Sequence, residues 1–148
     1  MSNPNVDVLN DVTKTLIDSQ KGYQKVFEIA DKSHVLREKF RSLAAERLEL
    51  ISAFQERVSE YGGEPVTKGG VGGSLHRAWA DFTALFQDDE KAALEAVDDG
   101  EEHLADKIGR ELDNEKLDAS TIELLQRARG SACHGDRFAD ALIGLSDR

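Results

Sequence analysis

One stretch of the chain places an ionisable residue on a line that a protein core would otherwise fill with apolar side chains. Between positions 93 and 112, apolar residues recur at helical spacing and Glu101 falls on the same line; they are Ala93, Val97, Leu104, Ile108 and Leu112. A carboxylate taken out of water costs several kcal/mol unless it is paired or binds a metal. Glu101 therefore needs a partner inside the protein, and the type of partner limits what this chain does.

The best candidate for that partner is Arg47, which lies on a second apolar line far back in the chain. It interrupts a line made of Leu36, Phe40, Leu43, Leu50, Phe54, Val58 and Tyr61. A planar guanidinium stays charged and holds a carboxylate through two hydrogen bonds. We therefore predict a buried ion pair between Arg47 and Glu101, with Glu46 and His134 making ordinary hydrogen bonds at its edges.

Composition favours an all-α fold in a single domain covering residues 1–148. Charged residues make up 32% of the 148 residues and aromatic residues only 6%, and there are two prolines. This profile is typical of long amphipathic helices, and a chain of this length buries a substantial core without disulfides. Apolar periodicity together with capping and stop residues predicts helices at about 5–31, 34–61, 74–86, 88–114 and 119–145.

The connections between these helices predict their topology. A short turn at 31–33 makes the first two long helices an antiparallel hairpin, and the break at 113–118 does the same for the last two. Residues 62–73 contain six glycines and a proline, so with the short helix after them they suit a crossover along the bundle. The second and third long helices would then run parallel, and we expect a parallel pair among neighbouring helices.

Charge and cysteine usage exclude several classes of partner. The net charge of −10 and the absence of a Lys/Arg cluster disfavour nucleic acid. No apolar run approaches the ~20 residues that span a bilayer, so we expect no membrane segment. The start of the sequence has no basic, apolar leader, and the single cysteine, Cys133, cannot form an intrachain disulfide. We expect a cytoplasmic protein.

Several short motifs match a known family pattern, and they extend over nearly the whole chain. They are Leu9-Asn10-Asp11, Asp18, Gly22-Tyr23, Glu46-Arg47, Gly62-Gly63-Glu64-Pro65, Gly73-Ser74-Leu75-His76-Arg77-Ala78-Trp79, Gly100-Glu101 and His134. With these motifs the chain resembles a bacterial family of ferritin-like four-helix-bundle proteins that is classed as a domain of unknown function. The resemblance implies a ferritin-like bundle of two antiparallel hairpins and dimerisation, and it brings no established reaction.

The ferritin-like resemblance raises a second possibility for Glu101, a metal site. Di-iron proteins of this fold use one Glu from each of two helices and a Glu-x-x-His from each of the other two. This chain departs from that pattern, because Ser131 precedes His134 by three residues where an acid is needed. The remaining candidates form a reduced iron or manganese site of Glu46, Glu101 and His134. We single out no catalytic residue.

Aromatic residues of the predicted crossover helix indicate where two subunits would meet. Trp79, Phe82 and Phe86 share one face of a helix that is too short to be stable alone in water. We expect this face to contribute to a homodimer interface. The sequence thus favours a non-enzymatic interaction or structural protein without a cofactor, and the ferritin-like resemblance adds a stress-associated role. The alternative is an iron or manganese binder or oxidase.

Overall fold

The computed structural model describes residues 3–29, 34–70 and 90–146 of the chain. Within them are four long helices, α1 (Pro4–Ile29), α2 (His34–Glu60), α4 (Glu90–Glu111) and α5 (Ala119–Ser146), and no strand. The predicted all-α class is therefore confirmed for these residues, and the helix ends lie within a few residues of the predicted ones. The short helix predicted at 74–86 lies outside the described residues.

Local hydrogen bonds explain where the first two helices begin and end. The Asn3 side-chain oxygen accepts a hydrogen bond from the Asn5 amide at 2.9 Å, so Asn3 caps α1 and Pro4 occupies its first turn. At the end of α2, Gly62 has a φ of 78°, and the Gly63 amide donates to the Val58 carbonyl at 3.0 Å. This left-handed glycine cap stops α2 at the predicted place.

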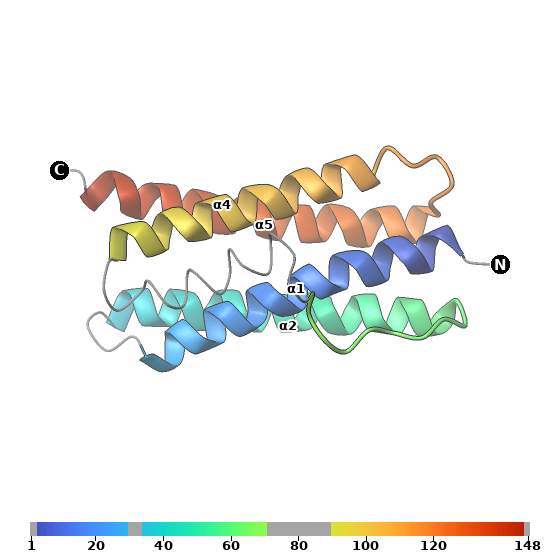
Figure 1. The fold of residues 1–148 in the computed structure, drawn as a ribbon, viewed down its shortest axis with the longest axis horizontal. Coiled ribbons are helices and arrows are strands. Elements are labelled where there is room, and N and C mark those ends of the chain that lie inside the picture. Colours follow the sequence, from blue (N-terminus) through green and yellow to red (C-terminus); the bar gives the residue numbers. More distant parts are fainter. Residues whose placement is uncertain (1–2, 30–33, 71–89, 147–148) are drawn as a thin grey trace.

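The helices form two antiparallel hairpins packed side by side, α1 with α2 and α4 with α5 (Figure 1). The colours in Figure 1 show that α2 and α4 run in the same direction, as predicted. The backbones of these two helices stay apart because α1 and α5 lie between them, and only long side chains such as Arg47 and Glu101 reach across. The expectation of a parallel pair of neighbours was therefore wrong: the parallel helices lie across a diagonal, and each larger contact joins antiparallel helices.

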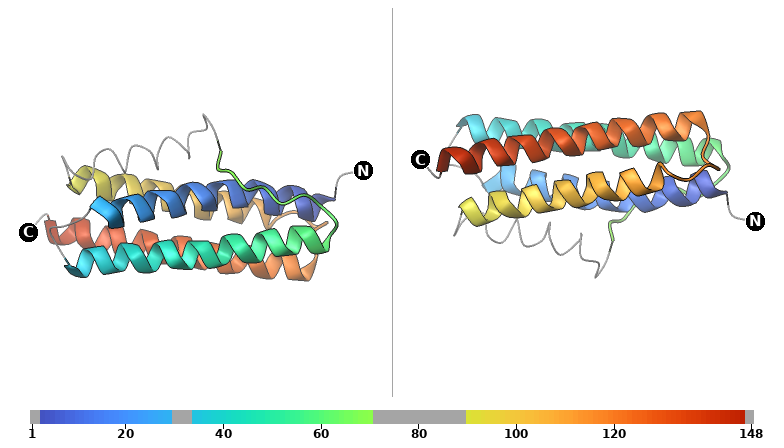
Figure 2. Two further views of the ribbon diagram at one scale, coloured as in Figure 1. Left: turned by 90° about the horizontal axis from the view of Figure 1, so that it is seen from below. Right: turned by 90° about the horizontal axis from the view of Figure 1, so that it is seen from above.

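The described part of the connection after α2 turns back and follows α1 (Figure 2). The Asn10 side chain donates to the Glu64 carbonyl at 3.0 Å and accepts from the Val66 amide at 3.1 Å. Further along, the Gly70 amide donates to the Asp18 carboxylate at 3.2 Å. Residues 64–70 are thus fastened to α1 by its polar side chains, and they run back along the bundle as a crossover requires.

The core consists of two apolar clusters, one toward each end of the bundle. One contains Leu9, Val12, Leu16, Phe54, Leu104, Ile108, Leu125 and Ala128 among others. The other contains Tyr23, Val26, Phe40, Leu43, Ala93, Leu94, Val97 and Ala139 among others. Between these clusters all four helices contribute a buried polar residue, namely Ser19, Arg47, Glu101 and Ser131. We call these four residues the polar layer.

None of the described helices combines the length and the apolar character needed to cross a membrane.

Candidate functional site

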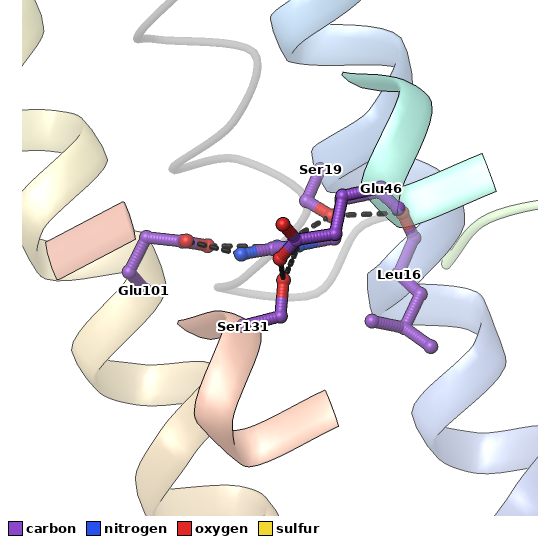
Figure 3. A network of polar contacts seen from close by, with 6 residues as sticks. Leu16, Ser19, Glu46, Glu101 and Ser131 are labelled. Atoms are coloured by element: carbon purple, nitrogen blue, oxygen red, sulfur yellow. Dashed lines mark hydrogen bonds and ion pairs between the residues drawn. The ribbon is translucent and has the colours of Figure 1, made fainter. Parts of the chain in front are cut away.

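The polar layer brings together one side chain from each helix, and Figure 3 shows Ser19, Glu101 and Ser131 converging on one point between the helices. Ser19 comes from α1, Arg47 from α2, Glu101 from α4 and Ser131 from α5. Ser19, Arg47 and Glu101 are completely buried, and Ser131 is only 6% exposed. Their helical positions place them on the core-facing lines of their own helices, so the amphipathic packing that buries the apolar residues buries them as well.

Arg47 is the centre of this network. Its guanidinium forms a bidentate salt bridge with Glu101, in which Nη1 donates to Oε1 at 2.9 Å and Nη2 donates to Oε2. Nη1 also donates to Ser19 Oγ at 3.0 Å, and Nε donates to Ser131 Oγ at 2.9 Å. These bonds compensate the charge that burial takes out of water, which is the condition for a stable ion pair in a core.

Each serine hydroxyl donates its own hydrogen bond to another group, which makes its oxygen a good acceptor for Arg47. Ser19 Oγ donates to the Leu16 carbonyl at 2.8 Å, within α1. Ser131 Oγ donates to Glu46 Oε1 on α2. A hydroxyl that donates to one group while accepting from another is polarised in one direction. The result is a continuous hydrogen-bonded path from Glu101 through Arg47 and Ser131 to the half-buried Glu46.

Tyr23 borders the network on the side of the second apolar cluster. Its ring lies 5.6 Å from the Arg47 guanidinium carbon and stacks on Phe40, with ring centroids 5.9 Å apart. Complete burial, followed by the neighbouring Glu101 carboxylate, raises the pKa of the Tyr23 hydroxyl well above 10.0. Burial lowers the pKa of Arg47, but the adjacent Glu101 outweighs it, so the pKa of the guanidinium is raised and it stays charged.

Gly135 makes the space that Glu101 occupies. A Cβ atom built on Gly135 would overlap Glu101 Oε2 and would lie 3.0 Å from the Tyr23 hydroxyl. Any other residue at this position of α5 would therefore displace the carboxylate from Arg47. Neither Gly135 nor Tyr23 was predicted from the sequence to be part of this site. The helical spacing of Ser131 and Gly135, four residues apart, places them on one face and would have indicated the glycine.

The predicted metal ligands occupy different parts of the bundle. Glu101 is held by Arg47 in the core, whereas Glu46 and His134 line a hollow between α2 and α5. The His134 Nε2 atom lies 3.0 Å from the Lys39 ammonium, which can only donate, so this ring nitrogen accepts. In this arrangement the three side chains do not converge on one point, and Glu101 already has a cation as its partner.

Acidic side chains lie close enough to share a cation elsewhere among the described residues. They form two overlapping groups, Asp98 with Asp99 and Glu102, and Asp98 with Asp136 and Asp140. Neither group includes Glu46, Glu101 or His134. The predicted interface residues Trp79, Phe82 and Phe86 lie outside the described residues.

The residues of the polar layer are buried and form hydrogen bonds with one another, and this limits the chemistry that the site can perform. The carboxylate of Glu101 faces a permanent cation, and the pair joins α2 of one hairpin to α4 of the other. The bond from Ser131 to Glu46 joins the same two hairpins. The polar layer therefore fixes how the hairpins are placed against each other, because slipping one past the other would leave buried charges unpaired.

Comparison with known proteins gives a match to one family model. No curated protein and no solved structure matches the chain significantly. The family model, described as a domain of unknown function (DUF2383), matches residues 5–114. The match covers α1, α2 and α4, with Ser19, Arg47 and Glu101 of the polar layer, and it ends before α5. The chain belongs to this family, the domain of unknown function DUF2383.

Proposed function

We propose that this chain is a ferritin-like helical-bundle protein without enzymatic activity that acts as an interaction or structural protein. The observation that supports this most is the position of Arg47, whose buried guanidinium bonds side chains from the other three helices. Ferritin-like metal enzymes direct carboxylates and imidazoles into that space from their four helices. A permanent cation there repels a metal ion and already engages Glu101. By analogy with ferritin-like proteins, we extend the proposal to a stress-associated role.

The helix order supports the ferritin-like part of this proposal. Two antiparallel hairpins whose second and third long helices run parallel need one long crossover, which is the connection that ferritin-like folds use. The fastening of residues 64–70 along α1 agrees with the start of such a crossover.

Metal analysis tests the absence of enzymatic activity. Protein purified without added chelator should contain no stoichiometric iron or manganese. After anaerobic loading with Fe(II) and admission of oxygen, it should develop no diiron absorbance and should consume oxygen no faster than the buffer control. Stoichiometric metal that is lost in Glu101→Ala would overturn the proposal.

The second candidate function is an iron or manganese binder or oxidase with a reduced site of Glu46, Glu101 and His134. One observation favours it: Glu46 and His134 line the same hollow, and the carboxylate and imidazole groups suit these metals. The geometry described above does not fit a site that includes Glu101, because Arg47 holds it. This candidate predicts that Glu46→Gln and His134→Ala each weaken Mn(II) binding measured by calorimetry, whereas the leading proposal predicts no Mn(II) heat to lose.

We also propose that the protein is a cytoplasmic homodimer, with Trp79, Phe82 and Phe86 at the interface. The sequence pattern of these residues supports the proposal, and a single cysteine without an intrachain partner agrees with a reducing compartment. Sedimentation at micromolar concentration should give the dimer mass, and Trp79→Ala should weaken the dimer. A mass that stays monomeric at all concentrations would contradict it.

A further inference from the structure

A hollow between α2 and α5 opens to solvent directly above the polar layer. It has a volume of about 280 Å³, and its lining consists of Glu46, Glu49, Leu50, Arg127, Gly130, Ser131 and His134. Leu50 and Ser131 are buried and form its inner wall, while Glu49, Arg127 and Gly130 are exposed. This volume is at the lower limit of ligand sites in proteins, so the hollow suits a small molecule rather than a nucleotide or a cofactor.

Residues of both charges line this hollow. The α2 wall presents two carboxylates, Glu46 and Glu49, which lie three residues apart on one helix face. The α5 wall presents the Arg127 guanidinium. Neither Glu49 nor Arg127 forms an ion pair with another side chain in the part of the chain that the structure describes. Both charges therefore remain available to a ligand.

His134 and Glu46 have internal partners that define what a ligand can meet. The Nε2 atom of His134 accepts from Lys39, so this ring nitrogen is engaged at the rim. Glu46 Oε1 accepts from Ser131, which leaves the other carboxylate oxygen to bond into the hollow. A positive group in the ligand is therefore favoured on the α2 side, and a negative group on the α5 side next to Arg127.

We propose that this hollow binds a small zwitterion of the amino-acid class. The ligand's ammonium group lies between Glu46 and Glu49, and its carboxylate lies on Arg127, whose planar fork matches a carboxylate. A molecule with only one of these charges leaves the opposite wall unpaired. The site is thus selective for a dipolar ligand, and this inference does not depend on the proposed absence of enzymatic activity.

Occupation of the hollow is coupled to the centre of the bundle. An ammonium on Glu46 offsets part of the negative charge that Ser131 faces, and Ser131 donates to Glu46 and accepts from Arg47. Because these contacts exist only in the folded chain, a ligand that uses them also stabilises the folded state by mass action. Saturating ligand should therefore raise the melting temperature as well as give a binding isotherm.

The test uses glycine and L-alanine as probes, with methylamine and acetate as probes that carry one charge each. Titrations followed by amide NMR should give saturable shifts at Leu50, Gly130 and Ser131 with the two amino acids. Acetate and methylamine should bind at least about tenfold more weakly, because each can form an ion pair on only one side of the hollow. The variants Glu49→Gln and Arg127→Gln, which change exposed side chains, should each weaken amino-acid binding by a similar factor.

A glycine pair on α5 gives a matched control. A Cβ atom on Gly130 or on Gly144 meets no atom within 4 Å, so both helix positions accept a side chain, but only Gly130 lines the hollow. Gly130→Gln should abolish the shifts while the protein stays folded, and Gly144→Gln should bind like the wild type. Equal binding by both variants would overturn the site.

Two further outcomes would also overturn the proposal. One is the absence of saturable shifts with either amino acid. The other is that only Mn(II) changes the amide NMR signals of residues around the hollow, and that these changes depend on Glu46, Glu49 and His134 but not on Arg127. That result would identify a cation site in place of a zwitterion site.

Discussion

The carboxylate of Glu101 on α4 occupies the space directly over Gly135 on α5, where any Cβ atom would overlap it. This contact sets how closely the two helices of the second hairpin approach at the level of the polar layer. It also holds the carboxylate in the position from which it bonds Arg47. A glycine in one helix thus determines whether an ion pair between two others forms.

Replacing Gly135 by Ala should destabilise the protein, although alanine is the better helix former. The added methyl group forces Glu101 away from Arg47, and such overpacking costs about 1–3 kcal/mol. Gly130→Ala, on the same helix and with open space around its Cβ atom, should instead stabilise by up to about 1 kcal/mol. Urea unfolding of both variants measures the difference. Equal effects would mean that Glu101 moves aside at no cost.

Removing one partner of the buried pair should be more costly than removing both. Arg47→Met or Glu101→Leu alone leaves a buried charge without its partner and should destabilise by about 3–5 kcal/mol. The double variant removes both charges and should recover much of this loss. Denaturant unfolding of the wild type, the two single variants and the double variant gives the coupling. A double variant that is no more stable than the single variants would contradict the pairing and favour the metal reading.

Alkaline pH should destabilise the fold through Tyr23. Since burial raises its pKa, the folded protein keeps the phenol proton above pH 10, where an unfolded chain loses it. The stability therefore falls as pH rises above about 10, with a slope of up to about 1.4 kcal/mol per pH unit from this group. Tyr23→Phe lacks this contribution. The difference between the stability–pH curves of the wild type and Tyr23→Phe isolates it, and parallel curves would refute it.

The crossover should loosen locally when Asn10 is truncated. Asn10→Ala removes two hydrogen bonds of the Asn10 side chain: the one it accepts from the Val66 backbone amide and the one it donates to the Glu64 carbonyl. Amide exchange at Val66 should become about fivefold faster, corresponding to a hydrogen bond worth ~1 kcal/mol. Exchange at Gly70, which Asp18 holds, provides the internal control. Equal acceleration at Val66 and Gly70 would show that the segment opens as one unit.

Particular residues show how far the sequence predicts this site. The positions of Arg47 and Glu101 on apolar lines predict two buried charges, because helical periodicity assigns each residue to a face of its own helix. Periodicity says nothing of which atoms meet across helices. The contacts of Ser19 and Ser131 with Arg47, and the overlap of Gly135 with Glu101, depend on the axial offset between helices that are far apart in sequence.

The amino-acid sequence by itself determined the all-α class, the four long helices and the need for an internal partner for Glu101. These properties follow from composition, capping residues and local periodicity, which act within one helix. Only the tertiary structure decided that the parallel helices α2 and α4 lie across a diagonal, and that Glu46 joins the polar layer to an open hollow. Many packings bury the same apolar faces, and the arrangement that forms is one that also pairs the buried charges of Arg47 and Glu101.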